Sequence, residues 1–512
     1  MNSFSPIPPS DSFYFKLENL YNDNPMARET LLANLDRSEY PALPMTPNFG
    51  LDGAIDLMRS GLRSESALLP LLQLVEQSGK CSPPMKRRKL SPGVSFRPAP
   101  LPLTLQQAVS TFSINDAANY SAPRGQTSAV YALRRMEGLL MDDPDAYPPD
   151  GIFITEGGGT NGIYTAMRYI AKRFAGGEIL ALGPSYFQFF ENAVDGNNPA
   201  RSLLSGSVTN SAVGTVRFLP SVTEIEAGIT ECTQVLVITQ PNNPTGEYYS
   251  DDELKDIINL AIERDIYILE DGAFEELVFP AEKASFKSVS QVANEMGVLD
   301  RVICNVKSYS KGKNLPGLRL GYLASANRDF IQFMSRDLWL QRDCPGKLKS
   351  GTICLDSILR SVELALLRGA PTIESAIEAV RELFDFGSCD VPINPDVAKT
   401  YLIQRQTDMN VYKGNFDYLL NQYLGGAGPF RAVSQTRGAY NTFLRLDSPS
   451  SSSQFEIAQR LFTEQGLETQ WGPSFDNNDA RWESEYGLWL RVTCSTSVPY
   501  LRDSIERLTL TI

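Results

Sequence analysis

The sequence predicts an α/β fold with a mostly parallel sheet, and three observations support this class. Five short apolar runs have the length and content of buried strands: residues 151–155, 178–182, 235–239, 266–270 and 302–306. Segments with helical periodicity separate them, and this alternation is typical of parallel α/β sheets. At 512 residues the chain exceeds what one hydrophobic core usually organises, so we expect two domains that share a cleft.

The clearest of the predicted helices follows the third strand, at residues 250–265. Ser250 can cap its start, acidic residues fill its first turn, and one face is apolar through Leu254, Ile257, Ile258 and Ala261. In such sheets ligands gather at the carboxyl ends of the strands. Most of the motifs described below directly follow a strand.

The chain divides into three predicted parts. Residues 1–100 are an irregular N-terminal extension, 101–330 a large domain, and 331–512 a small C-terminal domain, with helices after about residue 329 and strands at 442–447 and 488–493.

The end of the extension, residues 78–100, is rich in proline and carries a basic run at 86–89. We expect an exposed linker there. A nuclear signal is the alternative, although short basic runs are more often solvated loops.

Composition excludes several function classes. With 47 basic and 60 acidic residues the formal charge is -13, which argues against a nucleic-acid surface. No apolar run reaches the length of a membrane span and the first residues lack a secretory signal, so we expect a cytoplasmic protein without a membrane partner. The seven cysteines form no C-x-x-C pair, and we expect no metal site.

The chain contains no histidine. This excludes nucleophile pairs that use histidine as base, as well as histidine-ligated metals. Acid-base work must then fall to lysine, tyrosine or carboxylates, and lysine can also form imines.

The run 308–323, SYSKGKNLPGLRLGYL, follows the fifth strand. Its lysine flanked by hydroxyls, with an arginine eight residues later, suits a Schiff-base lysine beside a phosphate site; Ser308, Ser310 and Arg319 would supply donors and charge to the phosphate. The run resembles the S-x-S-K-x-x-x-x-P-G-L-R-x-G signature of class I/II aminotransferases. These are pyridoxal-phosphate enzymes of fold type I, with a large domain and a smaller α+β domain. The spacing identifies Lys311, not Lys313, as the imine lysine.

Two further segments resemble family motifs at strand ends. In NNPTG, Asn243 matches the asparagine that donates to the 3-oxygen of the cofactor ring, although such a run can also be an ordinary turn. In DGAF, Asp271 matches the carboxylate that pairs with the pyridine nitrogen and keeps the ring an electron sink. The family usually has a tyrosine at the position of Phe274, and Phe274 cannot donate to the 3-oxygen.

The resemblance extends to the other side of the cofactor. In ITEGGGTNG the backbone amides of Gly158, Gly159 and Thr160 would bind the phosphate at a helix start. Tyr186, after Pro184 and Ser185, matches the aromatic residue that stacks on the pyridine ring. Three residues later, Phe189 stands where the family often has a histidine.

Two residues complete the implied site. Tyr120 matches the tyrosine that reaches the phosphate of the neighbouring subunit, which implies a homodimer. Arg491 matches the arginine that binds the substrate α-carboxylate in a two-pronged contact, although a surface strand arginine is the alternative. Arg124 could lie near the cleft and favour an anionic side chain.

These residues favour an aminotransferase that acts on an amino acid and forms an oxo acid through pyridoxamine phosphate. The same site also serves lyases, decarboxylases, cyclases and synthases of specialised metabolism, including enzymes acting on S-adenosylmethionine, so these stay open. A transcription regulator with an aminotransferase-like domain is a remote alternative, because residues 1–100 lack a recognisable DNA-binding helix pair.

Overall fold

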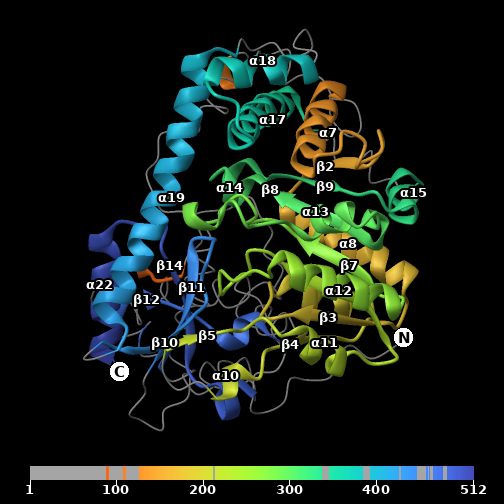
Figure 1. Cartoon of the computed structure of the whole chain (residues 1–512). Helices are drawn as coiled ribbons and strands as arrows, with labels where there is room; N and C mark the ends of the chain where they lie inside the picture. The colour runs from red at the N-terminus through yellow and green to blue at the C-terminus, as the bar shows by residue number, and fades with distance from the viewer. Residues whose placement is uncertain are drawn as a thin grey trace, which may run out of the picture.

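The structure is a computed structural model, shown in Figure 1. It describes residues 88–91, 108–110, 126–210, 214–336, 345–384, 393–425, 428–446, 457–458, 461, 465–476 and 481–511. Most of the predicted N-terminal extension, together with Tyr120 and Arg124, lies outside these residues.

A seven-stranded mixed sheet forms the centre of the molecule. Its strands are, in spatial order, β2 (Ile152–Glu156), β9 (Leu320–Ala324), β8 (Val302–Ser308), β7 (Tyr267–Asp271), β6 (Thr233–Thr239), β3 (Glu178–Leu182) and β4 (Ala200–Leu203). Of the seven strands, β9 alone runs opposite to the other six. The predicted mostly parallel sheet is therefore confirmed, and all five predicted strands belong to it.

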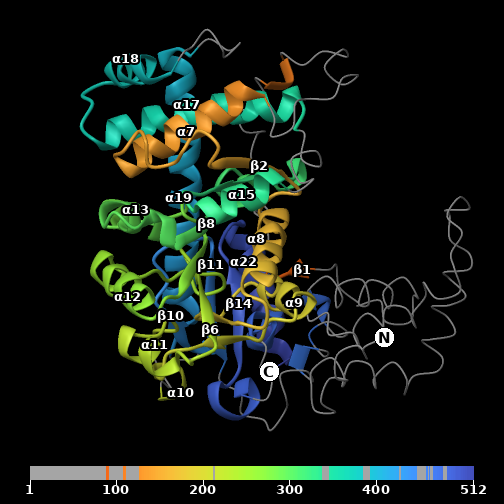
Figure 2. The same ribbon diagram turned by 90° about the vertical axis from the view of Figure 1, so that its right-hand side faces the viewer.

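Each face of this sheet packs against its own group of helices. Leu236 and Ile238 of β6 join a core with α7 (Thr127–Met141), α12 (Asp251–Glu263), α13 (Val289–Glu295) and α17 (Lys347–Leu367). Val235 and Val237 point to the other face, into a core with α8 (Gly159–Arg173), α9 (Gln188–Asp195) and α15 (Arg328–Arg336). Figure 2 shows α12 and α13 on one side of the sheet and α8, α9 and α15 on the other. The unbroken apolar runs of the sequence reflect this burial on both faces.

The cap predicted for α12 is present. The Ser250 hydroxyl accepts a hydrogen bond from the Glu253 amide, and the Glu253 carboxylate accepts one from the Ser250 amide in return. Such a reciprocal cap satisfies two amides that the first turn leaves without partners, and it fixes where the helix begins after the carboxyl end of β6.

A second, five-stranded sheet forms the smaller α+β part. Its order is β13 (Gln470–Trp471), β14 (Trp489–Thr493), β11 (Asn441–Leu446), β10 (Phe430–Ser434) and β5 (Gly214–Val216). The helices α19 (Pro395–Tyr423) and α22 (Val498–Thr511) pack against it. This confirms the fold class: a large sheet flanked by helices plus a smaller α+β domain.

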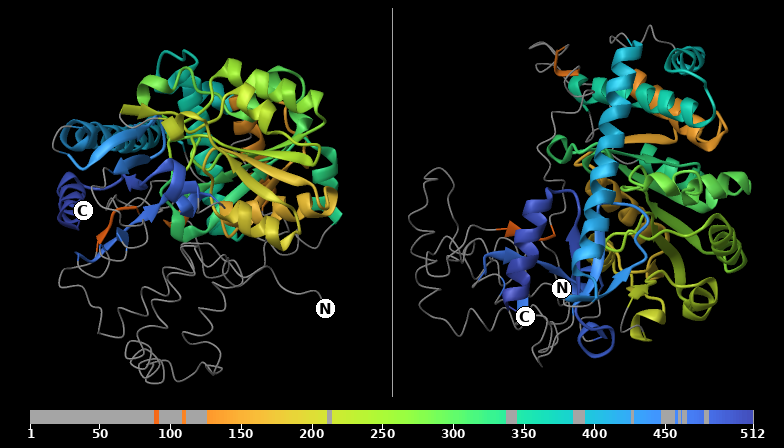
Figure 3. Two further views of the ribbon diagram at one scale, coloured as in Figure 1. Left: turned by 90° about the horizontal axis from the view of Figure 1, so that it is seen from below. Right: turned by 60° about the vertical axis from the view of Figure 1, so that its left-hand side comes forward.

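The sheets and helices cross the predicted division at residue 330. The strand β5 pairs in parallel with β10, so the small sheet takes one strand from the first 330 residues. Conversely, α17 packs on α7, and α19 extends from α18 (Ile373–Leu383) down to the small sheet, as Figures 1 and 3 show. The domain boundaries themselves stay a prediction.

Part of the predicted linker is built into the small domain. Residues Arg88–Lys89 form β1, which pairs in parallel with β12 (Leu467–Glu468). Arg88 forms an ion pair with Asp503 of α22 at 3.0 Å, and both Leu90 and Ser91 are buried. Residues 88–91 are therefore not an exposed loop, because the apolar Leu90 side chain joins the core beneath the small sheet. Among the described helices, none is long and apolar enough to cross a membrane.

Candidate active site

The predicted site residues meet at one edge of the seven-stranded sheet. In the parallel register Thr239 of β6 lies beside Asp271 of β7, and Asp271 lies beside Val306 of β8. The carboxyl ends of the three strands therefore coincide. Asn243 follows β6 and Lys311 follows β8, so the register brings both to the edge that Asp271 occupies.

Lys311 lies on α14 (Tyr309–Gly312), a single turn directly after β8. The Ser308 hydroxyl caps this turn by accepting a hydrogen bond from the Ser310 amide at 3.3 Å. The Lys311 ammonium lies 5.8 Å from the centre of the Phe274 ring. Phe274 is buried and packs edge-on against Tyr440, with ring centres 5.3 Å apart.

Asp271 is a buried carboxylate at the end of β7, and it accepts a hydrogen bond from the Ala273 amide at 3.0 Å. Burial raises the pKa of Asp271 to about 6, while the positive charge of Lys311 acts in the opposite direction. A cationic ring nitrogen placed beside such a buried carboxylate would stabilise its ionised form.

The residues predicted to bind the phosphate also lie together. Gly158, with φ +72°, precedes α8, and a Cβ built on it would lie 3.6 Å from the Ser310 hydroxyl. A Cβ on Gly159 would lie 3.1 Å from Ser308 Cβ. Arg319 is exposed and donates from Nη2 to the Gly157 carbonyl at 2.6 Å.

The glycine after Arg319 has a steric reason. A Cβ on Gly321 of β9 would lie 2.9 Å from the carbonyl carbon of Gly158 and 2.6 Å from the Lys307 oxygen. A side chain at Gly321 would therefore push β9 away from the phosphate turn and from β8. The R-x-G part of the motif is thus explained by close backbone approach.

These residues fit pyridoxal phosphate. The start of α8 has no side-chain cap and no acidic residue in its first turn, so the amides from Gly159 and Thr160 suit an anion. Ser308, Ser310 and Arg319 add donors from the lysine side. The buried Asp271 suits the ring nitrogen.

Arg491 lies in β14 with only 4% of its surface exposed, which excludes the surface-arginine alternative. Its Nη1 donates to Asn243 Oδ1 at 2.9 Å, which joins two predicted site residues directly. Its Nε donates to the Ser91 hydroxyl at 2.6 Å and its Nη2 to the Ser91 carbonyl at 3.1 Å. The Ser91 hydroxyl in turn donates to Gln470 at 3.0 Å.

Two residues of this site were not predicted from the sequence. Ser91 contacts Arg491 only because β1 pairs with β12, and no local motif marks this pairing. Tyr440 packs on Phe274, and burial raises its pKa while the charge of Arg491 opposes that shift. No sequence motif marks Tyr440 as a neighbour of Phe274.

The structure says less about the other predicted residues, Tyr186, Phe189, Tyr120 and Arg124. Tyr186 is half-buried after β3, and its ring lies 4.5 Å from that of Phe187. Phe189 is buried in the core that also holds Leu269 of β7, so an apolar layer lies behind the strand that carries Asp271. Tyr120 and Arg124 lie outside the described residues.

Comparison with known proteins agrees with these features. A family model described as aminotransferase class I and II matches residues 114–381. An aspartate aminotransferase of Thermotoga maritima is 26% identical over 270 residues, 51% of this chain and 64% of that protein. An aromatic-amino-acid aminotransferase of Thermococcus litoralis is 34% identical over 128 residues, 25% of this chain and 31% of that protein. This chain thus spans less than two thirds of the length of either curated relative.

A solved structure of the Thermotoga maritima aspartate aminotransferase shares the fold, with a TM-score of 0.57 and 17% identity. The superposition covers 86% of this chain and 95% of that one.

Because the pKa of Asp271 is raised, we expect this residue to lower the free energy of unfolding of the cofactor-free protein in a pH-dependent way. An unfolded Asp ionises near pH 4, so the native state binds the extra proton between about pH 4 and 6, and stability falls as pH rises through this window. The cost above pH 6 is about 3 kcal/mol. Asp271→Asn should therefore raise the thermal unfolding midpoint above pH 6 and converge with wild type near pH 4.

The control is Asp150→Asn, which changes an exposed carboxylate. It should track the wild-type midpoint at every pH. Parallel profiles for wild type and Asp271→Asn would show that Asp271 does not carry this cost.

Proposed function

The chain belongs to the class I and II aminotransferase family, and from this premise we propose that it transfers the amino group of an amino acid to an oxo acid with pyridoxal phosphate as cofactor. Family membership implies the cofactor. The observation that carries the proposal is the convergence of Asn243, Asp271 and Lys311 at one sheet edge beside the glycine turn.

Each residue at this edge has a proposed task. When bound, pyridoxal phosphate withdraws electrons from the α-carbon of the amino acid. Asp271 holds a negative charge beside the ring nitrogen, and Asn243 donates to the ring 3-oxygen. Lys311 anchors the cofactor and then, as a free amine, takes a proton from the α-carbon and returns it.

The phosphate is held by the turn between β2 and α8. The amides of Gly159 and Thr160 donate from the helix start, and Gly158 gives the turn its positive φ. Ser308, Ser310 and Arg319 donate from the segment that carries Lys311. Tyr186 stacks on the ring face. One short stretch of chain thus binds both the phosphate and the reactive carbon of the cofactor.

Arg491 is proposed to bind the substrate α-carboxylate. Ser91 receives hydrogen bonds from Nε and Nη2, and Asn243 from Nη1, which fixes the plane of the guanidinium. A planar cation held in this way meets a carboxylate with two donors at a defined angle. Because Asn243 is also proposed to contact the ring oxygen, the carboxylate and the ring would be held in register.

The substrate is proposed at the level of class, an α-amino acid. The relatives described above are named for aspartate and for aromatic amino acids. A screen of the twenty amino acids and S-adenosylmethionine as amino donors, followed through the cofactor spectrum, would identify the donor.

Lys311 should be indispensable. With an active donor, wild type should release one oxo acid for each cofactor converted to its amine form, and Lys311→Ala should lose at least about a thousandfold of this rate. Borohydride treatment followed by peptide mass spectrometry should locate the cofactor on Lys311.

Label on Lys313 would contradict the assignment, which is supported by the ion pairs that Lys313 already makes with Glu276 and Asp356. Conversion of the donor to an alkene or a cyclic product without the amine form of the cofactor would instead support the lyase or cyclase alternative.

Arg491→Lys should raise the KM for the amino donor at least about tenfold while leaving bound cofactor intact, because a point charge cannot reproduce the two-pronged contact. The measurement is donor-dependent kinetics together with cofactor content. Arg437→Lys is the control, since Arg437 pairs with Glu282 at 2.6 Å and is partly exposed. An unchanged KM in Arg491→Lys would move the carboxylate site elsewhere.

We further propose a homodimer, because Tyr120 resembles the tyrosine that reaches the neighbouring site. Mixed dimers of Tyr120→Phe and Lys311→Ala subunits would contain one site with both native residues. Activity after mixing should exceed that of either variant alone. Mixing Lys311→Ala with Arg491→Lys is the control, because both residues belong to one subunit's site. A monomeric protein at working concentration would contradict this proposal.

A further inference from the structure

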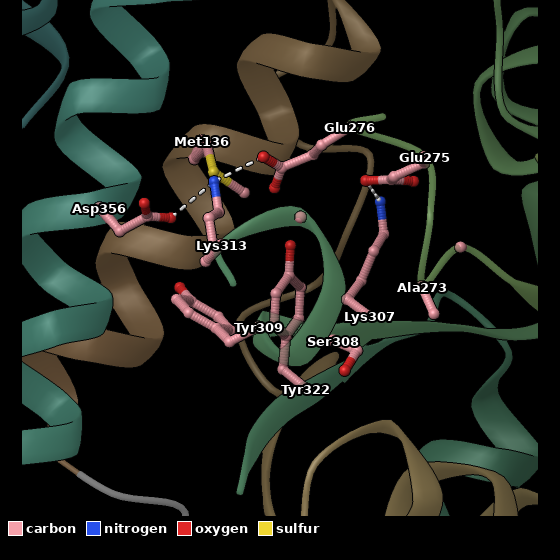
Figure 4. A pocket seen from close by; sticks show the side chains of 12 residues that line it. Met136, Ala273, Glu275, Glu276, Lys307, Ser308, Tyr309, Lys313, Tyr322 and Asp356 are labelled. Atoms are coloured by element: carbon pink, nitrogen blue, oxygen red, sulfur yellow. Dashed lines mark hydrogen bonds and ion pairs between the residues drawn. The ribbon is translucent and has the colours of Figure 1, made fainter. Parts of the chain in front are cut away.

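Two lysines with nearly inaccessible side chains flank Lys311, since the Lys307 side chain is 4% exposed and that of Lys313 is 7% exposed. Lys307 lies four residues before Lys311 and Lys313 two residues after it. Each forms an ion pair with one of two consecutive glutamates, Lys307 with Glu275 and Lys313 with Glu276, the latter at 2.6 Å. Figure 4 shows the two pairs on either side of a small cavity.

The two glutamates belong to the turn that carries the rest of the cofactor site. Residues 271–277 lead from Asp271 through Phe274 to both glutamates. The Lys311 segment is thus joined to the Asp271 turn at two points, one on each side of the reactive lysine. We call Lys307, Glu275, Lys313 and Glu276 together the lysine brace.

Both halves of the lysine brace also contact helices of the surrounding fold. Lys313 also contacts Asp356 of α17 at 2.9 Å, and Glu276 contacts Arg405 of α19 at 2.5 Å. On the other side Lys307 lies 3.5 Å from Glu137 of α7. The brace therefore connects the site to three helices that are remote from one another in sequence.

The charged state of the Lys313 half is fixed by its partners. Although burial disfavours the ammonium, Asp356 and Glu276 raise the pKa of Lys313 above its usual value. Burial likewise disfavours the Glu276 carboxylate, but Lys313 and Arg405 hold its pKa well below its usual range. Both shifts favour the ionised form of the pair.

A buried ion pair is weak evidence of a role in stability. Apolar residues of similar volume usually match or exceed a buried ion pair in stability, because desolvation offsets the attraction between the charges. Ion pairs differ from apolar contacts in being directional, so they fix how two segments sit against each other. The packing is also close, since a Cβ on Gly312 would lie 3.3 Å from Glu276 Cβ.

We propose that the lysine brace is a set of positioning residues that holds the Lys311 amine in place over the turn of Asp271 and Phe274. The inference rests on the proposed function, in which Lys311 is the reacting amine. None of the four side chains touches the cofactor in this role. They act through Lys311, whose ammonium lies 5.8 Å from the centre of the Phe274 ring.

The test removes one half of the brace as a pair, Lys313→Met with Glu276→Gln, so that neither of these two is left charged without the other. Arg405 keeps its ion pair with Glu363, and Asp356 keeps the hydrogen bond from the Tyr401 hydroxyl. Displacing a reacting amine by about 1 Å can cost up to about a hundredfold in rate. We expect kcat to fall at least about tenfold, with the donor KM within about twofold of wild type. The visible circular dichroism per bound cofactor, which reports a fixed orientation, should fall by about half or more.

Two further variants separate positioning from general damage. Lys283→Met removes a lysine of the same charged network, which pairs with Glu363 of α17 at 3.4 Å. It should keep wild-type dichroism and kcat. Lys313→Arg retains the charge and should recover most of both signals.

If the double variant does not fold, Glu276→Asp replaces it, because this change keeps the charge and withdraws it by one methylene. Wild-type dichroism and kcat in Glu276→Asp and in any folded double variant would overturn the brace. Such a result, with Lys311→Ala inactive, would leave the proposed function standing. Full turnover in Lys311→Ala would instead remove the proposed function itself.

Discussion

The site depends on the parallel register of β6, β7 and β8. Because Thr239, Asp271 and Val306 lie side by side, the three strands end at one edge, and the residues that follow them share one region of space. The proximity of Asn243, Asp271 and Lys311 therefore follows from strand pairing and needs no short motif that specifies a contact between them. A slip of one residue in any of these pairings would turn Asp271 to the opposite face of the sheet.

Asn243 and Asp271 are buried at this edge, so the charge of a carboxylate there depends strongly on its partners. Two carboxylates of one turn show opposite outcomes. Burial dominates at Asp271 and raises its pKa to about 6, whereas Lys313 and Arg405 dominate at Glu276 and hold its pKa low. The Glu276 carboxylate is already paired with cations of the protein. The Asp271 carboxylate, which burial destabilises, can still stabilise an added cation. Such divergence between neighbouring acids is typical of sites that separate structural from chemical roles.

How much the sequence could predict follows from the range of the contacts. Five of the seven strands of the large sheet follow from local apolar runs, whereas β4 and β9 were not predicted. Lys311, Asp271, Asn243 and Arg319 follow from short motifs that resemble those of the family, and the structure places them around the carboxyl ends of these strands. The role of Ser91 could not be predicted, because β1 gains its place only by pairing with β12 near the other end of the chain. The same limit applies to Asp356 and Arg405, which look like ordinary polar positions in long helices until the fold brings them to Lys313 and Glu276.

The helix α19 links the two halves of the site. Arg405 contacts Glu276 beside the Lys311 segment, and ten residues further Asn415 donates to the Cys494 and Thr496 carbonyls just after β14, the strand of Arg491. Ten helical residues span about 15 Å. A continuous helix is stiff over that length, so the separation between the lysine segment and the arginine strand is set by one element instead of by the loops between them.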